Sequence, residues 1–481
     1  MSTTETRPAN TIGVIGAGTM GSGIAQLAAR SGARTLLHDP VAEALRKGDS
    51  RAREGLQKEA AKGKLSPEQA DAAAELLHPA EDLEAMSECD LVIEAAPERI
   101  ELKHDLYRRL EQIVGEQCVL ASNTSSLPIT KIAAAVSRPE RVVGMHFFNP
   151  APVMRLLEII AGELSDERSL ALAEATGRAM GKETIRAADG PGFIVNRCNR
   201  PFGLEALRLL GEKIADVQTI DRIVRVGGGY RMGPFELSDL VGVDTGFDVA
   251  LSFYELSFGE PRWRPSPIQA QRVAAGLHGR KRGRGYYDYA HEPYRPPDAD
   301  PPVRTGDAIV EGEGPLAQAL RSLTRGQSGP TIAVVGLGGE VAGEPFYAVT
   351  PLGLVETTGP AGEEAFTALG LPTARVRETP GGVLGRIVCQ LVNECAFALE
   401  AGIGVAEDID KGMELGLNHP RGPLAWGDRL GLENVLGLLD ELCDEYREDR
   451  YRPAPLLRRL VRAGRLGRAS GAGFFAYDDA A

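Results

Sequence analysis

The 481-residue chain has few cysteines, few histidines and no long apolar run. Its six cysteines are scattered, with no C-x-x-C pair and no histidine at ligand spacing, so we expect reduced core thiols and no metal site. No window approaches the roughly 18 uninterrupted apolar residues of a membrane span. The first ten residues lack the basic and apolar segments of a signal peptide, which predicts a cytoplasmic protein without membrane contact.

Positive charge is also in deficit, since 54 Lys and Arg face 67 Asp and Glu, a net charge of −13. The resulting field repels polyanions, which argues against nucleic acid and anionic membranes as partners. The composition, 43% hydrophobic and 25% charged, is that of a globular protein, and the length predicts about three domains. A small-molecule substrate is therefore the better expectation.

From Thr11 to about Ala187, short apolar runs alternate with amphipathic stretches, which predicts a parallel sheet with crossover helices. Beyond Asp189 to Gly192 the apolar residues recur at helical spacing, which predicts a second, mainly helical domain. The expected helices are Gly18 to Ser31, Pro40 to Lys62, Glu101 to Val114, Phe193 to Glu212, Thr219 to Val226 and Pro234 to Val241.

The later part of the chain repeats the earlier part. Asp189 to Arg197 (DGPGFIVNR) aligns with Glu378 to Arg386 (ETPGGVLGR) at an offset of 189 residues. The same offset relates further pairs without a gap: Glu205 and Glu394, Asp221 and Asp410, Gly233 and Gly422, Asp239 and Asp428, Gly242 and Gly431. We therefore predict that the helical domain is duplicated.

The proline-rich segment AHEPYRPPDADPP predicts an extended, exposed linker between the copies. After it, one strand-like run, TIAVVG, is too little for a second full dinucleotide-binding domain. We expect a Rossmann-type α/β domain followed by two mainly α-helical domains: 11–188, 189–289, a linker at 290–330, an eroded α/β remnant at 331–378, and a second, non-catalytic helical copy at 379–478.

A glycine-rich turn, G-x-G-x-x-G, follows the first predicted strand and opens a helix: Gly16, Gly18, Thr19, Met20 and Gly21. This arrangement supplies a tight turn, bare backbone beside a pyrophosphate and helix N-terminal amides that face it. Asp39 ends the next strand, 21 residues after Gly18, where a carboxylate accepts from ribose hydroxyls and repels a 2′-phosphate. The pattern predicts NAD as cofactor; the alternative is a structural turn with Asp39 as a helix cap before Pro40.

Oxidation of an alcohol by NAD needs a base, and histidine is the usual one near neutral pH. Of seven histidines, only His146 ends a strand of the predicted sheet and is followed by an aromatic pair at its carboxyl edge. Glu158 lies in the apolar run RLLEII, where a carboxylate is costly without a partner. A His146–Glu158 pair meets both needs, because the carboxylate fixes the tautomer and steadies the imidazolium. The alternative is a purely structural histidine.

Five separated motifs resemble the L-3-hydroxyacyl-CoA dehydrogenase family, in order from Ile12 to Tyr289: GAGTMGSGIA, SNTSSL, HFFNPAPVMRLLEII, DGPGFIVNR and GGGYRMGPFELSDLVGVD. The resemblance implies reversible NAD-dependent oxidation of an L-3-hydroxyacyl-CoA to the 3-oxo form, with His146 as base and Glu158 as its orienting partner. The single-chain arrangement, with a second helical domain and no hydratase domain, resembles bacterial members that act on 3-hydroxybutyryl-CoA, or on 3-hydroxyadipyl-CoA, in fatty-acid β-oxidation or phenylacetate catabolism.

The resemblance also assigns Ser125 and Asn196 to the substrate oxygens; the alternative for Ser125 is a helix cap before Pro128. It places four residues near the cofactor: Glu98, Lys103, Asn149 and Lys281. Taken by itself, Lys103 is typical of a solvated helix face. Three lysines resemble the surface that meets the phosphates of coenzyme A, with solvated side chains as the alternative: Lys58, Lys62 and Lys64.

The second copy lacks these groups, since Asn196 corresponds to Gly385 and Thr331 to Arg377 supplies no second His, Glu or serine cluster. We therefore predict one active site. Family members with one helical domain commonly dimerise through it, so we expect the second copy to replace a partner subunit, in a monomer or a homodimer. The competing functions are an NAD-dependent dehydrogenase of a free polyol or hydroxy acid, and a non-catalytic structural member of the family.

Overall fold

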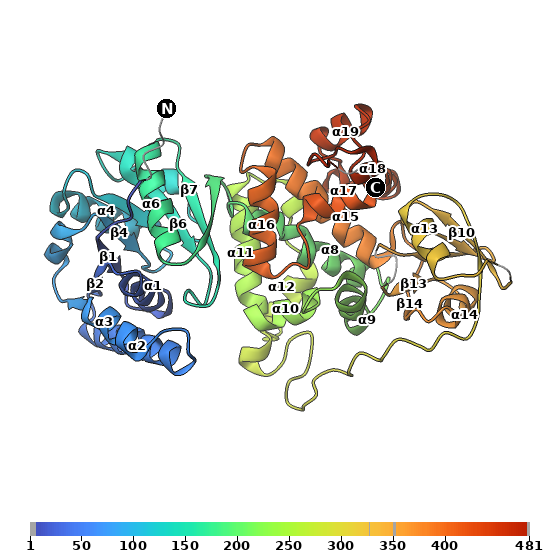
Figure 1. The fold of residues 1–481 in the computed structure, drawn as a ribbon, viewed down its shortest axis with the longest axis horizontal. Helices are drawn as coiled ribbons and strands as arrows, with labels where there is room; N and C mark the ends of the chain where they lie inside the picture. The colour runs from blue at the N-terminus through green and yellow to red at the C-terminus, as the bar shows by residue number, and fades with distance from the viewer. Residues whose placement is uncertain (1–5, 327, 350–352, 479–481) are drawn as a thin grey trace. The chain divides into compact units, whose positions relative to one another are not determined.

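The computed structural model describes residues 6–326, 328–349 and 353–478, and the chain divides into two compact units. The first unit comprises Met1–Val195 with Gly402–Leu417, and the second comprises Asn196–Ala401 with Asn418–Ala481. Each unit contains one β-sheet with helices packed against it (Figure 1). The unit boundaries differ from the predicted domain boundaries because a stretch of the second helical copy, 402–417, belongs to the first unit by its contacts.

The first unit contains an eight-stranded sheet in the order β3-β2-β1-β4-β5-β6-β7-β8. The central strands β1, β4, β5 and β6 are buried almost throughout, as is usual for sheets covered on both faces. The strands are β1 Thr11–Ile15, β2 Arg34–His38, β3 Leu77–Ala80, β4 Leu91–Glu94, β5 Val119–Ser122, β6 Val142–Phe147, β7 Leu156–Ala161 and β8 Glu183–Ala188.

The helices of this unit begin and end within two residues of the predicted ones where a prediction was made. They are α1 Thr19–Arg30, α2 Ala42–Ala61, α3 Pro67–Glu75, α4 Ile100–Ile113, α5 Ile129–Ala133, α6 Glu167–Ala179 and, from the second copy, α16 Ala406–Leu417. The strand order reverses at β1 and β4, and folds of this kind bind ligands beyond the carboxyl ends of strands at such a point. The glycine-rich turn follows β1 there.

One neighbouring pair, β6 and β7, is antiparallel, whereas the sequence predicted a parallel sheet. A parallel connection needs a crossover of about a dozen residues or more, and residues 148–155 are too few. The chain therefore turns back, and the register of the two strands places His146 directly opposite Glu158.

The second unit contains the first helical copy from Asn196 onward and the second copy without 402–417. The predicted helix from Phe193 to Glu212 is split after Cys198, because Pro201 has no N–H to continue the helical hydrogen bonds. The helices are α7 Val195–Cys198, α8 Arg200–Gly211, α9 Val217–Arg222 with a π-helical turn Ile223–Gly227, α10 Pro234–Val241, α11 Val243–Leu256, α12 Pro267–Ala274, α15 Gly382–Glu400, α17 Pro423–Leu430, α18 Leu432–Tyr446 and α19 Pro455–Arg462.

The predicted linker and remnant are more structured than expected. Residues 290–308 form no helix or strand, but β9 Ile309–Glu311 and α13 Pro315–Ser322 follow within the predicted linker. With the next segment they form a six-stranded sheet in the order β14-β13-β12-β11-β10-β9. Its other elements are β10 Thr331–Val335, β11 Gly338–Val341, β12 Glu344–Tyr347, β13 Val355–Thr357, α14 Pro360–Ala368 and β14 Thr373–Arg375. Strands of three to five residues carry too little periodicity for sequence reasoning to find them.

The duplication is visible in equivalent hydrogen bonds. The carboxylate of Asp239 accepts the backbone N–H groups of Tyr286 and Tyr287, and Asp428 accepts those of Phe474 and Phe475 in the same way. In each copy, these two hydrogen bonds join the last turn of the copy to the helix that carries the aspartate.

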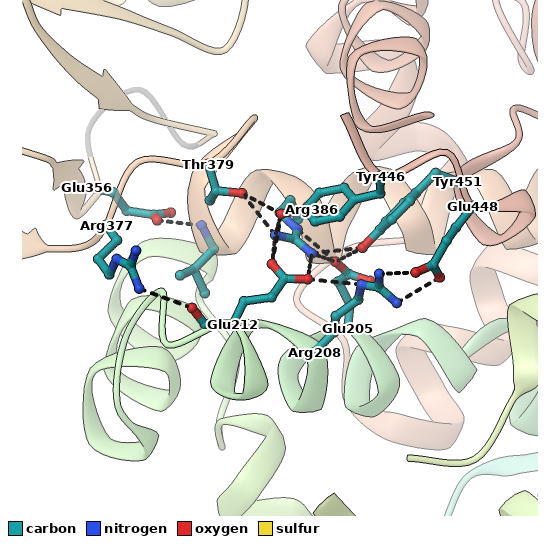
Figure 2. Close-up of polar contacts among 11 residues, drawn as sticks. Glu205, Arg208, Glu212, Glu356, Arg377, Thr379, Arg386, Tyr446, Glu448 and Tyr451 are labelled. Carbon is teal, nitrogen blue, oxygen red and sulfur yellow. Dashed lines mark hydrogen bonds and ion pairs between the residues drawn. The ribbon is translucent and has the colours of Figure 1, made fainter. Parts of the chain in front are cut away.

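The two helical copies pack on each other through α8 and α15, and they exchange reciprocal ion pairs. Arg197 Nε donates to Glu394 at 3.1 Å, and Arg386 Nε donates to Glu205 at 2.7 Å. Because the two pairs are related by the 189-residue offset, this interface has the form of a two-fold symmetric one. Figure 2 shows Arg386 surrounded by carboxylates and tyrosine hydroxyls.

Within the described residues, α15 is the one helix long and apolar enough to cross a membrane. Of its most apolar stretch, 89% is buried inside the protein. It is therefore a core helix of the second unit.

Candidate active site

The three glycines of the turn after β1 have three different surroundings. Gly16 has φ +95°, and a Cβ there would lie 2.6 Å from the carbonyl oxygen of Ala95. A Cβ at Gly21 would lie 1.7 Å from the carbonyl oxygen of Gly16, so helix and turn approach as closely as backbone allows. Gly18 has nothing within 4 Å of its Cβ position. The start of α1, at Thr19 and Met20, is thus open to an anionic group on the side of Gly18.

Asp39, just after β2, is attached to this turn. Its Oδ2 accepts the backbone N–H of Ala17 at 2.9 Å, and its Oδ1 accepts that of Val41 at 2.9 Å. The second bond closes a local turn before α2, whose N-cap is Val41 rather than Asp39, and the first holds the carboxylate beside the glycine loop. The arrangement fits a dinucleotide with a free 2′-hydroxyl.

His146 and Glu158 form a buried pair. Their residues are 6% and 0% exposed, and His146 Nδ1 lies 2.6 Å from Glu158 Oε2. The other ring contacts of His146 within the described chain are the aromatic side chains of Phe148 and Phe193. A carboxylate at this distance holds the proton on Nδ1, which leaves the Nε2 lone pair free to accept another.

Glu158 is itself fixed by the backbone. Its Oε1 accepts the N–H groups of Ile194 and Val195, each at 3.1 Å, at the start of α7. These two backbone N–H groups hold the carboxylate of Glu158 in position beside His146.

A second hydrogen-bond network, whose bonds to Glu98 are largely exposed, holds the loop that carries Ser125. Glu98 Oε1 accepts the backbone N–H groups of Ser125 and Ser126, at 3.0 and 3.2 Å. Burial raises the pKa of Glu98, but Lys103 and two nearby hydroxyls outweigh this and bring it below 4.5. Ser125 is exposed, and its hydroxyl makes no hydrogen bond to another described residue.

Lys103 is 1% exposed, so the alternative of a solvated helix face is wrong. Its Nζ lies 2.6 Å from Glu94 Oε1 and 3.3 Å from Glu98 Oε2. Sequence reasoning missed Glu94, although a glutamate that ends the buried strand β4 needs a partner. It also missed Asn123, whose Oδ1 accepts the N–H of Phe147 at 2.8 Å and so braces the end of β6.

Comparison with known protein families accounts for most of the chain. The 3-hydroxyacyl-CoA dehydrogenase NAD-binding domain matches residues 11–190. The C-terminal domain of the same enzymes matches twice, at 192–289 and 381–477. The chain belongs to the 3-hydroxyacyl-CoA dehydrogenase family. It is therefore an NAD-dependent oxidoreductase of acyl-CoA thioesters, with the Rossmann-type domain and the two helical domains that the sequence predicted.

Known 3-hydroxyacyl-CoA dehydrogenases resemble the chain over two different lengths. The 3-hydroxyadipyl-CoA dehydrogenase of Escherichia coli K12 is 39% identical over 471 residues, which covers 93% of this chain and 97% of that protein. A crystal structure of 3-hydroxybutyryl-CoA dehydrogenase from E. coli K12 has a TM-score of 0.83 at 35% identity, and covers 95% of this chain and 99% of that one. A probable 3-hydroxybutyryl-CoA dehydrogenase of Deinococcus radiodurans is 40% identical over 277 residues, 58% of this chain and 99% of that protein.

The remaining predicted residues of this dehydrogenase belong to elements of both units. Lys58, near the end of α2, and Lys62 and Lys64, in the turn before α3, are all exposed, which suits either CoA phosphates or solvent. Asn149 is exposed after β6. In the second unit, Asn196 lies in α7, and Lys281 Nζ lies 2.6 Å from Asp244 Oδ1.

The small sheet holds a partial counterpart of the buried pair. Glu356 on β13 accepts the N–H groups of Val383 and Leu384, at 2.6 and 2.9 Å, and these residues correspond by the repeat to Ile194 and Val195. The residue opposite Glu356 on the antiparallel neighbour β12 is Tyr347, where the first sheet has His146. The sequence did not reveal this counterpart of Glu158, because the equivalence is one of strand register. Of the His–Glu pair, the small sheet thus has a counterpart of the glutamate and a tyrosine in place of the histidine.

We expect Glu356 to make the stability of the second unit depend on pH. Burial raises its pKa to about 7 from 4.5, although two backbone N–H groups lower it. Because the folded state binds this proton more tightly, the contribution is complete below pH 4.5 and is lost as the pH rises through about 7. Glu356→Gln should flatten the decline in unfolding free energy between pH 5 and 8, measured by urea unfolding.

The matched control is Glu340→Gln, which removes an exposed carboxylate of the same sheet and should leave the slope unchanged. An unchanged slope in Glu356→Gln would show that the buried glutamate titrates as it does in the unfolded chain.

Proposed function

We propose that the chain oxidises an L-3-hydroxyacyl-CoA with His146 as general base. When bound, NAD accepts a hydride from the 3-carbon. His146 Nε2 takes the hydroxyl proton, and Glu158 steadies the imidazolium that forms. In the reverse direction the same imidazolium returns the proton to the oxygen. The observation that carries the proposal is the 2.6 Å contact between Nδ1 and a fully buried, backbone-anchored carboxylate.

We further propose Ser125 and Asn196 as hydrogen-bond partners of the substrate oxygens. Ser125 is suited to this because Glu98 fixes its backbone while its hydroxyl is exposed and unengaged within the described chain. Asp39 and the glycine turn would hold NAD, with Glu98, Lys103, Asn149 and Lys281 as further cofactor-site residues. Lys103 would act through Glu98, since its own amine is buried.

We propose 3-hydroxyadipyl-CoA as the preferred substrate and 3-hydroxybutyryl-CoA as the second candidate. The first is supported by 39% identity, over nearly the whole chain, to a protein named for it, and the second by the full-length structural relative. We expect kcat/KM with NAD to be at least about tenfold higher for 3-hydroxyadipyl-CoA, a difference of about 1.4 kcal/mol in transition-state binding. The measurement is NADH formation from both thioesters under the same conditions.

Free 3-hydroxy acids and polyols are the controls, and turnover of either at the rate of the thioesters would favour the competing dehydrogenase function. A kcat/KM for 3-hydroxybutyryl-CoA equal to or above that for 3-hydroxyadipyl-CoA would reverse the order of the two substrates.

We propose that the second helical copy replaces a partner subunit. Its support is the reciprocal exchange of Arg197–Glu394 and Arg386–Glu205, because residue i contacts j and j contacts i only across a two-fold interface. We also propose a cytoplasmic location, because no disulfide joins the cysteines of the described residues.

A further inference from the structure

A stretch of the second helical copy packs on the NAD-binding sheet of the first unit. Ala188 at the end of β8 donates its N–H to the carbonyl of Ile403 at 2.8 Å, and Arg186 donates its N–H to Asp408 Oδ2 at 3.0 Å. β8 is the outermost strand of the eight, so this segment covers a sheet edge that would otherwise expose unpaired backbone groups.

Helix α16, which follows this contact, lies directly behind the backbone that anchors Glu158. A Cβ at Gly416 would lie 2.9 Å from Leu156 Cδ2 and 3.2 Å from Val195 Cγ1. A Cβ at Gly412 would lie 3.2 Å from Val195 Cγ2 and 3.3 Å from Ile194 Cγ2. Both glycines therefore allow the helix to touch the two residues whose N–H groups hold Glu158.

The second unit contains a corresponding packing contact, but there Tyr347 and not a histidine lies opposite the glutamate. Arg377 donates its N–H to the carbonyl of Ile214 at 2.9 Å, the counterpart by the 189-residue offset of Ala188 and Ile403. A Cβ at Gly227, the counterpart of Gly416, would lie 3.4 Å from Leu384 and 3.5 Å from Leu354. The chain thus offers two packing contacts at corresponding positions, of which the one at Gly416 is the tighter and lies behind a His–Glu pair.

We infer that α16 of the second helical copy is a positioning element of the active site, which fixes Glu158 through Ile194 and Val195. The inference rests on the proposed function of His146 and Glu158. The carboxylate of Glu158 must keep its hydrogen-bond geometry to hold one tautomer of the histidine. Close packing of α16 against Ile194 and Val195 limits the movement of the two N–H groups that bind this carboxylate. The second copy then serves catalysis as well as architecture, although it carries no catalytic group.

The test compares Gly416→Val with Gly227→Val in the full-length enzyme. The added methyl groups at Gly416 press on Leu156 and Val195 and displace the donors of Glu158. We expect kcat to fall about tenfold, with the KM for NAD unchanged and the acidic limb of the kcat/KM profile at lower pH. The limb moves because a displaced carboxylate stabilises the imidazolium less. Gly227→Val makes the same substitution at the corresponding position, beside Glu356 and with more space around it, and should leave kcat and the profile unchanged.

Equal kcat losses in the two variants, or an unchanged kcat in Gly416→Val, would overturn the inference. Where Gly416→Val does not fold, Gly416→Ala applies the same pressure with one methyl group, and Leu156→Val should restore its kcat by removing the atom at 2.9 Å. Failure of the proposed function is separable, because it would appear as normal turnover in a variant of His146 itself.

Discussion

Replacing His146 with Gln is expected to lower turnover about 10²-fold or more while the fold and NAD binding stay intact. The amide keeps a polar group at the end of β6 but cannot accept and carry the hydroxyl proton. Its neighbours in the described chain, Phe148, Phe193 and Glu158, need no charge on the imidazole to pack. The measurement is kcat with a 3-hydroxyacyl-CoA, beside the dissociation constant of NAD by calorimetry.

A matched pair of glutamate variants accompanies this prediction. In Glu158→Gln the amide nitrogen faces Nδ1 of His146, which favours the other tautomer and places the proton on Nε2, so turnover should fall by a similar factor. Glu356→Gln removes the equivalent carboxylate, which accepts the equivalent two N–H groups but lies opposite Tyr347, and should not change turnover. Near-normal turnover in His146→Gln would exclude His146 as the base.

The residues of the pair could be predicted from the sequence because each was anomalous in its place. A histidine at the end of an apolar strand and a glutamate inside one both required an explanation, and a single contact supplied it. The sequence did not reveal how the strands bring these two side chains together. The short connection at 148–155 makes β7 antiparallel, and the register then sets the two side chains opposite each other.

Lys103 shows why pattern alone can mislead. Its place on a helix with charged neighbours predicts a solvated side chain, yet its amine is buried and forms ion pairs with Glu94 and Glu98. Those partners lie 9 and 5 residues before it and outside its helix, so helical spacing could not reveal them. The place of 402–417 could not be predicted for a related reason. The repeat assigns this segment to the second helical copy, whereas its contacts assign it to the first unit.

Replacing Arg386 with Met should lower the unfolding free energy of the second unit by about 3–5 kcal/mol. The arginine is 0% exposed, and it donates to Glu205 at 2.7 Å and to Glu212 at 2.8 Å (Figure 2). Without it, the carboxylate of Glu205, itself 3% exposed, keeps only the hydroxyl of Tyr451 as a donor within the described chain. A buried carboxylate with one neutral donor is far costlier than the pair it replaces.

Urea unfolding followed by tryptophan fluorescence measures this loss, since both tryptophans of the chain, Trp263 and Trp426, belong to the second unit. Arg386→Met with Glu205→Leu should regain most of the stability, because no charge is then left buried without a partner. A double variant as unstable as Arg386→Met would attribute the loss to packing instead.

The repeat supplies a second control in Arg197→Met, which breaks the symmetry-related pair. Glu394 keeps Arg262, whose Nε donates to it at 2.9 Å, so its charge stays compensated and the loss should be less than half that of Arg386→Met. Equal losses would mean that each arginine acts by filling space at the interface. Unequal losses would show that the two corresponding ion pairs now contribute differently to stability. The reason would be that Arg386 serves two carboxylates, Glu205 and Glu212, whereas Glu394 has two arginines as partners.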